Sequence, residues 1–194
     1  MDFKERMYSI LIVSAAEKFN TSLLDMFPDS RYHPIQLETS INSAKRALLE
    51  REYDLIVINS PLPDNDGIRF SIDVSGGKRS IVLLLVRGEL YTSVFDKVSS
   101  HGVYVLSKPT SRQSMSQCLD WMITSCEKFK KMEKKTLSLE DKMQEIRIVN
   151  RAKWLLIAQI KMNETDAHHF IEKQAMDRCI SKREIAEEII KTYS

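Results

Sequence analysis

Residues 115–162 read MSQCLDWMITSCEKFKKMEKKTLSLEDKMQEIRIVNRAKWLLIAQIKM, a stretch without proline or glycine. This composition predicts one long helix. Six residues within it follow one another in steps of three and four and form a narrow stripe: Phe129, Met132, Thr136, Leu139, Met143 and Ile146. A stripe of this width is typical of a helix that pairs with another helix. We therefore predict a coiled-coil linker over residues 112–147.

Two polar residues, Thr136 and Asn150, interrupt the apolar face of this helix. Because a polar residue in such a seam fixes register and oligomeric state at a cost in stability, we expect a parallel homodimer. The alternative is a helix that folds back onto its own domain. Beyond Ile146 the apolar face widens, which indicates that the same helix enters a small globular unit.

Two helix starts follow Met162. Asn163 is a helix cap with an acidic residue three positions later, and Ser181 and Glu184 have the spacing of a capping box. We predict helices over 164–176 and 182–191, so residues 140–194 form a three-helix all-α domain. The residues expected on the inner faces of the two short helices are Ala167, Phe170, Ile171, Ala175, Ile185, Ala186 and Ile189.

Composition sets broad limits on the protein. The 194 residues are 43% hydrophobic and 29% charged, which suits one large or two small globular domains. No apolar run approaches the roughly 20 residues that span a bilayer, and residues 1–6 lead into a strand-like segment, not a signal peptide. We expect a cytoplasmic protein. Cys118, Cys126 and Cys179 lack metal-ligand spacing, so we expect free thiols, no metal and no cofactor.

The net charge of +2 is distributed unevenly. Residues 1–110 hold 13 basic and 14 acidic side chains, a net charge of −1, whereas residues 111–194 hold 16 and 13, a net charge of +3. Residues 128–153 alone hold 9 basic and 4 acidic side chains, a net charge of +5. This segment is either a surface for an anionic partner or a lysine-rich helix face exposed to water.

The N-terminal 125 residues alternate short apolar segments with helical patterns. Strands are expected at 8–13, 32–37, 54–59, 81–86 and 103–107. Helices are expected at 17–27, 40–50 with Thr39 or Ser40 as N-cap, shortly after Gly67, and at 90–100. This alternation predicts a doubly wound, flavodoxin-like α/β domain with a parallel sheet, whose ligand site lies beyond the carboxyl ends of the strands.

Residues 53–67, YDLIVINSPLPDNDG, resemble the third strand and following loop of a response-regulator receiver domain. Ser107-Lys108-Pro109 resembles the Lys-Pro pair of that family's fifth strand. The resemblance covers residues 7 to about 125. It implies a phosphoryl-accepting site at the carboxyl edge of the sheet and a cis bond before Pro109.

The chemical residues of that site are mostly replaced. Asn59 stands at the position of the phosphoacceptor aspartate, and an amide oxygen is not a nucleophile of that kind. Ser14 and Ala15 stand in place of the acidic pair that holds Mg²⁺, a cation that prefers carboxylate oxygens. Leu85 or Val86 replaces the hydroxyl residue and Val105 the aromatic switch residue, so that only Lys108 remains.

We therefore predict a pseudo-receiver that serves as a constitutive dimerisation surface or as a docking surface for a regulatory protein. Lys108 is expected to be solvated or paired locally. Asp64 and Asp66 are expected to form the turn after the third strand rather than bind a cation.

The C-terminal helices resemble the ANTAR domain of bacterial antiterminators, over residues 140 to about 193. The resemblance rests on Arg151-Ala152-Lys153, on Ala167 and Ala175-Met176, and on residues 185–190, IAEEII. It implies a dimer that binds paired hairpins in a leader transcript and prevents formation of an intrinsic terminator.

The RNA-binding candidates are basic residues and one aromatic residue of the C-terminal part. Lys153 matches the family motif, and the others are chosen by charge: Arg151, Lys161, Lys173, Arg178, Lys182 and Arg183. Trp154 stands where the family has glycine. Its indole either stacks on an RNA base or, as its apolar neighbours suggest, packs in the core, which we expect. His168 and His169 are expected on the helix surface.

Three classes of function compete. The leading one is a non-enzymatic, RNA-binding antitermination regulator. A basic three-helix unit can also be a DNA-binding helix-turn-helix, but the helix at 182–191 carries Glu184, Glu187 and Glu188, which repel phosphates. The third is a protein-docking regulator without nucleic-acid contact. No nucleophile–base pair, phosphate loop or metal cluster indicates an enzyme, so no catalytic residue is assigned.

Overall fold

The computed structural model describes residues 7–28, 30–77 and 80–193. The chain divides into two compact units, Met1–Lys131 and Met132–Ser194. Residues 1–6 and 194, with which the predicted N- and C-terminal domains begin and end, lie outside the described part. Within that part, none of the helices combines the length and the apolar character that crossing a membrane requires.

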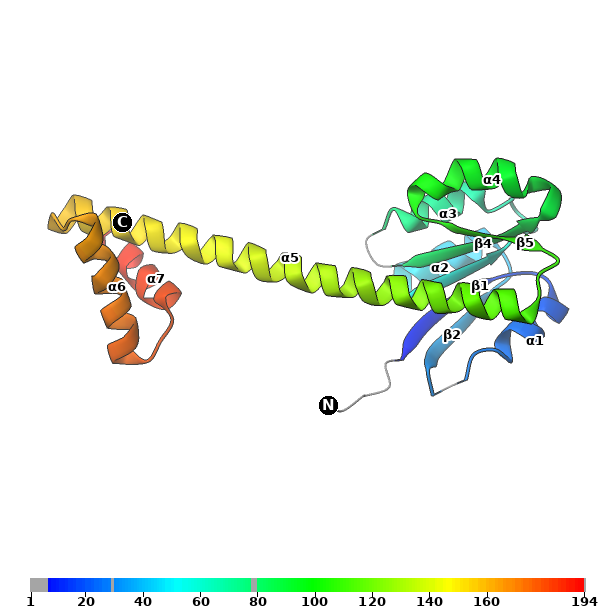
Figure 1. The fold of residues 1–194 in the computed structure, drawn as a ribbon, viewed down its shortest axis with the longest axis horizontal. Coiled ribbons are helices and arrows are strands. Elements are labelled where there is room, and N and C mark those ends of the chain that lie inside the picture. The colour runs from blue at the N-terminus through cyan, green and yellow to red at the C-terminus, as the bar shows by residue number, and fades with distance from the viewer. Residues whose placement is uncertain (1–6, 29, 78–79, 194) are drawn as a thin grey trace. The chain divides into compact units, whose positions relative to one another are not determined.

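A five-stranded parallel sheet forms the centre of the first unit (Figure 1). Its strands are β1 (Tyr8–Val13), β2 (Tyr32–Glu38), β3 (Leu55–Asn59), β4 (Ile81–Arg87) and β5 (Tyr104–Lys108), in the order β2-β1-β3-β4-β5. All pairs are parallel. The runs LIVIN of β3 and IVLLLV of β4 are buried throughout, as expected of strands covered on both faces.

Helices cover both faces of this sheet, which confirms the predicted doubly wound α/β fold. α2 (Ile41–Glu50), α3 (Ile68–Ser75) and α4 (Tyr91–Val98) pack on one face through residues such as Ala44, Phe70 and Val94. α1 (Glu17–Leu24) and the first part of α5 (Arg112–Ile160) pack on the other through Leu23 and Met122. Short 3₁₀ turns, Gly88–Leu90 and Ser99–His101, flank α4.

Local sequence signals account for most helix ends. The Ser40 hydroxyl accepts a hydrogen bond from the Ser43 amide (3.2 Å), as predicted for an N-cap. Gly67 precedes α3 with φ +78°, and a Cβ there would lie 3.0 Å from the Ile58 side chain, so glycine fits this position. The helix expected over 17–27 ends earlier, at Leu24, because Pro28 restricts the residue before it and the chain tightens into a turn.

The second unit consists of the end of α5, α6 (Glu164–Arg178) and α7 (Lys182–Tyr193). Small and branched residues form its core: Ala152, Leu156, Ala167, Ile171, Ala175, Ile185, Ala186 and Ile189. The predicted inner faces are therefore confirmed, with Phe170 only partly buried. Ser181 and Glu184 form the capping box, in which the Glu184 carboxylate accepts a hydrogen bond from the Ser181 amide (2.8 Å).

α5 is one helix of 49 residues, as its sequence predicts. The apolar residues of its central stripe are exposed: Phe129, Met132, Leu139, Met143 and Ile146 have between 51% and 59% of their surface accessible. In the single chain this stripe has no partner among the described residues, and the predicted coiled-coil pairing remains a prediction.

Candidate nucleic-acid interface and altered receiver site

A hydrogen-bond network of hydroxyl, amide and ammonium groups occupies the carboxyl edge of the sheet, where β1, β3 and β5 end. The Asn59 amide donates to the Ser14 hydroxyl (2.9 Å). The Lys108 ammonium donates to the Asn59 carbonyl oxygen (2.7 Å) and to the backbone oxygen of Ser60. Ser14, Asn59 and Ser60 are all buried. Lys108 is thus paired locally, as one of the two sequence-based alternatives stated.

This edge of the sheet lacks the acidic pair after β1 that would bind a divalent cation. Ser14 and Ala15 present a hydroxyl and a methyl group where carboxylates would be needed, and Leu85 and Val86 are buried in the core. Among the described residues, no cluster of three or more His, Cys, Asp or Glu side chains is placed to hold a metal ion. Burial, together with the charge of Arg87, lowers the pKa of Lys108.

Asp64 and Asp66 in the following loop serve as caps. The Asp64 carboxylate accepts hydrogen bonds from the backbone amides of Ile41 and Asn42 (3.0 Å each) and so caps α2 from another segment of the chain. These bonds lower the pKa of Asp64. Asp66 accepts from the Ile68 amide (2.9 Å), a local turn as predicted. Asp64 thus lies in the turn after β3, and its carboxylate also caps α2, a contact that the sequence did not predict.

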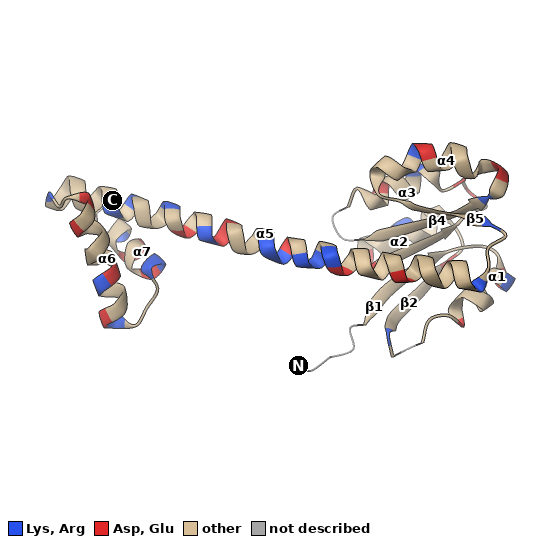
Figure 2. Ribbon diagram, viewed as in Figure 1, with Lys and Arg blue, Asp and Glu red and all other residues tan. Residues whose placement is uncertain are grey.

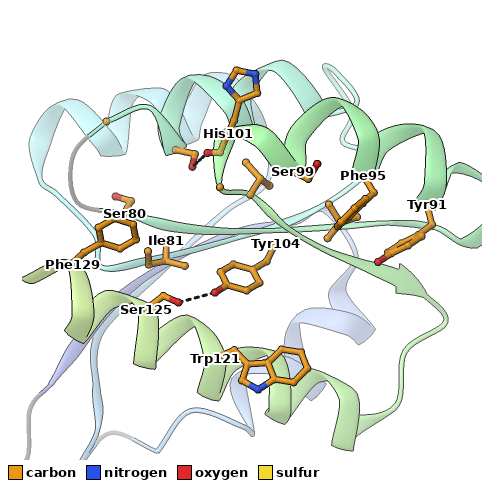
Figure 3. Close-up of a pocket in the computed structure, with 15 residues that line it drawn as sticks. Ser80, Ile81, Tyr91, Phe95, Ser99, His101, Tyr104, Trp121, Ser125 and Phe129 are labelled. Carbon is orange, nitrogen blue, oxygen red and sulfur yellow. Dashed lines mark hydrogen bonds between the residues drawn. The ribbon is translucent and has the colours of Figure 1, made fainter.

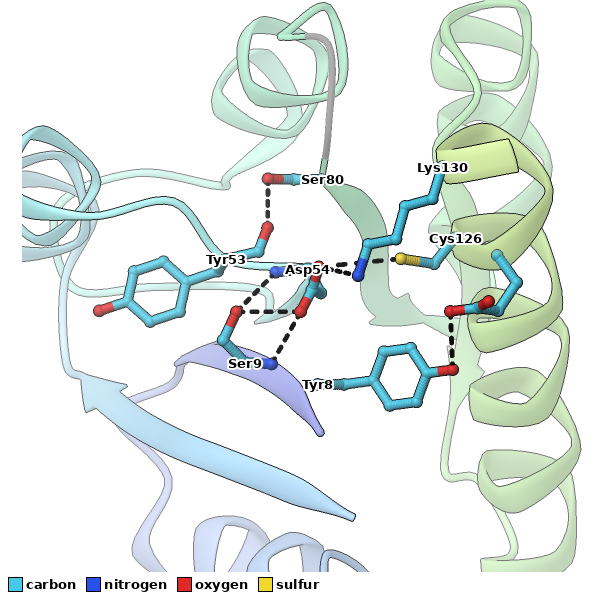
Figure 4. Close-up of polar contacts among 8 residues, drawn as sticks. Tyr8, Ser9, Tyr53, Asp54, Ser80, Cys126 and Lys130 are labelled. Carbon is cyan, nitrogen blue, oxygen red and sulfur yellow. Dashed lines mark hydrogen bonds and ion pairs between the residues drawn. The ribbon is translucent and has the colours of Figure 1, made fainter. Parts of the chain in front are cut away.

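An ion pair at the opposite edge of the sheet attaches α5 to the strands, and sequence reasoning missed it. The Lys130 ammonium lies 2.6 Å from the Asp54 carboxylate, which also accepts hydrogen bonds from the Ser9 amide and hydroxyl (Figure 4). The Tyr8 hydroxyl donates to the Glu127 carboxylate (3.0 Å). Only the charge of Asp54 at the start of a buried strand hinted at such a contact.

Four of the predicted RNA-binding residues form ion pairs within the second unit. Arg178 makes two bonds to Glu188 (2.5 and 2.7 Å), and Lys182 lies 2.5 Å from Glu172. Arg183 bonds Glu187 (2.9 Å). Lys153 lies 3.4 Å from Glu164, with 17% of its side chain exposed. These pairs partly neutralise both α6 and α7.

The remaining candidates are exposed cations on or just after α5 and on α6. Arg151, Lys161 and Lys173 are exposed, and within the described part of the chain none of them has a carboxylate in ion-pair distance. Trp154 is 71% exposed, so the expectation that it packs in the core is wrong. The buried positions of this helix segment are Ala152 and Leu156, and Trp154 lies between them on the other side.

Two of these exposed residues, Arg151 and Trp154, lie on one face of α5. Arg147, Arg151, Trp154 and Ala158 follow one another in steps of three and four, and Lys161 comes directly after the helix end. Figure 2 shows the basic residues distributed along α5. We call Arg147, Arg151, Trp154 and Lys161 the Arg–Trp face. It combines cations with one exposed aromatic ring, which suits unpaired nucleotides and phosphates.

Among the residues that the structure describes, the cysteines and histidines belong to no cluster of three or more metal-ligating side chains. Cys118 and Cys126 are buried and Cys179 is exposed, all as free thiols. Burial raises the pKa of the Cys118 thiol to about 11. His168 and His169 lie on the surface of α6, as predicted, with ring nitrogens 3.3 and 3.8 Å from the Glu172 carboxylate.

Comparison with known families assigns the C-terminal part. Residues 137–190 match the family model described as ANTAR domain. The chain is 23% identical over 139 residues to the transcriptional regulatory protein PdtaR of Mycobacterium tuberculosis, a match that covers 72% of this chain and 68% of that protein.

Solved receiver domains resemble the first unit. The signal receiver domain of an HD domain-containing protein from Pseudomonas fluorescens Pf-5 gives a TM-score of 0.56 at 22% identity, over 69% of this chain and 96% of that chain. The response regulatory domain of protein mrkE from Klebsiella pneumoniae gives a TM-score of 0.55 at 13% identity. That match covers 62% of this chain and 98% of the mrkE domain. At these identities the likeness shows the fold alone.

Proposed function

We propose that this chain, which joins a receiver-like fold to a C-terminal ANTAR domain, is an ANTAR-type regulator that binds RNA as a dimer. Its targets would be hairpins in leader transcripts, and binding would prevent transcription termination. The observation that carries the proposal is the match of residues 137–190 to the ANTAR domain on a folded three-helix unit. No catalytic function is proposed for either unit.

The Arg–Trp face supports this role on chemical grounds. RNA hairpin loops present unstacked bases, and an exposed indole can stack on them, while Arg and Lys bind the neighbouring phosphates. Trp154 and Arg151 are exposed three residues apart on α5, so one hairpin loop can contact both. Lys173 on α6 is a further exposed candidate.

The RNA-binding candidates that form ion pairs would bind RNA in a different way from the exposed, unpaired ones. Arg178, Lys182 and Arg183 would each give up an exposed ion pair to bind a phosphate. Since exposed ion pairs contribute at most about 1 kcal/mol, this exchange costs little. The Lys153 side chain, which is mostly buried beside Glu164, would contribute mainly through its positive charge.

We further propose that the first unit is a pseudo-receiver. Lys108 and Asn59 satisfy each other, and the edge lacks the carboxylates that would bind Mg²⁺. Incubation with acetyl phosphate and Mg²⁺, followed by intact-mass measurement, is expected to add no phosphoryl group. The added mass of a phosphoryl group on residues 7–125 would refute this part of the proposal.

The RNA proposal is tested by titrating the full chain with a two-hairpin leader RNA and with duplex DNA of equal charge, across a salt series. We expect RNA-selective binding by two chains per RNA. Arg151→Ala should reduce affinity and lower the slope of log K against log salt by about 0.7 to 0.9 per dimer-related contact. Lys97→Ala, an exposed lysine of α4, is the matched control. Equal or absent binding to RNA and DNA would refute the proposal.

A further inference from the structure

A groove on the first unit runs between α4 and the first part of α5, with the edge strand β5 as its floor (Figure 3). Its volume of about 630 Å³ lies within the range of about 300 to 1,000 Å³ that is usual for small-molecule sites. Among the described residues that line it, none belongs to the altered receiver site or to the Arg–Trp face. The proposed function therefore leaves this groove without a role.

The walls and the floor of the groove are aromatic. Tyr91 and Phe95 stand four residues apart on α4, and Trp121 and Phe129 stand eight apart on α5, so each pair lies on one side of its helix. The rings of Tyr91 and Phe95 are stacked, with centroids 5.8 Å apart and 18° between their planes. Tyr104 of β5 lies between the two walls (Figure 3). Five rings therefore border one space.

Each wall also keeps an aromatic surface open to solvent. Phe95 on α4 is 42% exposed, and Trp121 on α5 is 61% exposed. Aromatic rings prefer to contact another ring in an offset-stacked or edge-to-face arrangement, which contributes more than the burial of apolar area alone. A flat ring that enters between α4 and α5 would meet such surfaces on both of its sides. The groove therefore favours an aromatic ligand over an aliphatic one.

The side chains that line the groove are uncharged throughout the part of the chain that the structure describes. None of these residues is Lys, Arg, Asp or Glu, and the ring of His101 points away from the groove (Figure 3). A charged ligand would lose its hydration there without meeting an opposite charge. The groove therefore favours a neutral molecule.

Two hydroxyl groups in the groove can fix the orientation of such a ligand. The Tyr104 and Ser125 hydroxyls lie 2.7 Å apart and share one hydrogen bond. Because one hydroxyl donates to the other, the accepting hydroxyl keeps its own hydrogen. That hydrogen can be donated to an oxygen of a ligand between the walls.

The apolar surface is too narrow for a protein partner. The exposed residues Asp96 and Lys97 follow Phe95 on α4, and the exposed Lys128 precedes Phe129 on α5, so charges border both walls. A stable protein interface covers about 800 Å² on each partner and has an apolar centre depleted of charge. The groove suits a single small molecule instead.

We propose that this groove binds a neutral, flat aromatic molecule of two or three rings that carries a hydroxyl or carbonyl oxygen. The rings lie between Phe95 and Trp121, and the oxygen accepts a hydrogen bond from the hydroxyl pair of Tyr104 and Ser125. The inference concerns the first unit alone and goes beyond the proposed function. Its failure would leave the proposed RNA binding untouched.

The test uses 2-naphthol, a two-ring phenol that is neutral at pH 7. Equilibrium dialysis against the full chain should show one site per chain with a dissociation constant of about 100 µM, as expected of a ligand with few non-hydrogen atoms. 2-Naphthoate has the same rings with a negative charge and should bind at least about tenfold more weakly. Decahydro-2-naphthol is saturated and not flat and should bind at least about fivefold more weakly.

Variants of the chain locate the bound molecule. Phe95→Leu and Trp121→Leu keep an apolar side chain but remove the ring, so each should raise the dissociation constant about fivefold. Tyr104→Phe removes one hydroxyl and should raise it about threefold. The matched controls are Leu49→Ala, at an exposed apolar residue of α2, and Trp154→Leu, at the exposed indole of the second unit. Both controls should leave the constant within about twofold.

Several results would overturn the inference. They include no bound 2-naphthol at about 1 mM free ligand and equal affinity for 2-naphthol and 2-naphthoate. A loss of binding with Trp154→Leu but not with Trp121→Leu would place the molecule on the second unit. An affinity that falls as the chain concentration rises would show that another chain covers the groove.

Discussion

Replacing Lys130 by methionine is expected to lower the free energy of unfolding of the first unit by about 1 kcal/mol. The ammonium lies 2.6 Å from the Asp54 carboxylate, and the Lys130 and Asp54 side chains are 39% and 21% exposed. We therefore expect a contribution to stability between that of a fully exposed ion pair and that of a buried one. Methionine keeps the apolar stem but loses the cation held 5.4 Å from the Tyr8 ring centre. Asp54 keeps its bonds from Ser9, which limits the loss.

The assay uses the two tryptophans of the chain. A Trp154→Phe background leaves Trp121 as the only indole, so its fluorescence during urea unfolding reports the first unit. Lys97→Met, at an exposed lysine of α4, is the control and should change the free energy of unfolding by less than about 0.3 kcal/mol. A double-mutant cycle with Asp54→Asn should give a coupling of about 1 kcal/mol, and a coupling below about 0.3 would refute the assigned role of the ion pair.

The pH dependence of the same variant has a defined sign. Burial alone would lower the pKa of Lys130, but the hydrogen bond and charge of Asp54 outweigh it, and the pKa is raised. The ion pair therefore makes its full contribution to the free energy of unfolding below the unfolded-state pKa of about 10.4. This contribution is lost as the pH rises through the higher folded-state pKa of Lys130. The difference in free energy of unfolding between the Lys130→Met variant and its parent should be constant from about pH 7 to 9 and should disappear at higher pH.

Three other predictions concern single sites. Asn59→Asp should still take no phosphoryl group from acetyl phosphate by intact mass, because Ser14 supplies no carboxylate for Mg²⁺. Trp154→Ala should weaken RNA binding about tenfold in a filter-binding assay, the loss of one stacked base, with an unchanged circular dichroism spectrum because the side chain is exposed. In maleimide labelling at pH 8 followed by mass spectrometry, exposed Cys179 should react fast, and buried Cys118, whose pKa is about 11, only after unfolding.

Features set by neighbouring residues could be predicted from the sequence. The capping residues Ser40 and Ser181 each act on an amide three positions away, so their chemistry is visible in a short window. The strands were identified because a sheet buried on both faces requires continuous apolar runs. The length of α5 followed from the absence of any residue that stops a helix.

Features that depend on which face of a helix is buried could not be predicted in the same way. Trp154 lies among apolar residues in the sequence, but α6 and α7 cover the side of α5 that carries Ala152 and Leu156. The spacing of hydrophobic residues there is dense enough to fit more than one buried face. Tertiary packing, not local composition, decides the exposure of the indole.

Ion pairs between segments that are distant in the chain also could not be predicted from the sequence. Arg178 and Glu188 are ten residues apart on different helices, and Asp54 and Lys130 belong to a strand and a helix far apart in the chain. Charge counting predicted a basic C-terminal part but not which cations are neutralised. The structure separates the paired cations from exposed ones such as Arg151.

The bond between Lys108 and Asn59 bears on how the protein would respond over time. A receiver that accepts a phosphoryl group stores a record of a past signal until the group is hydrolysed. On the proposal made above, this chain stores none, and its output would follow the number of chains in the cell. At concentrations well below the dissociation constant, dimer abundance rises with the square of that number. Synthesis and degradation would then set both the threshold and the duration of the response.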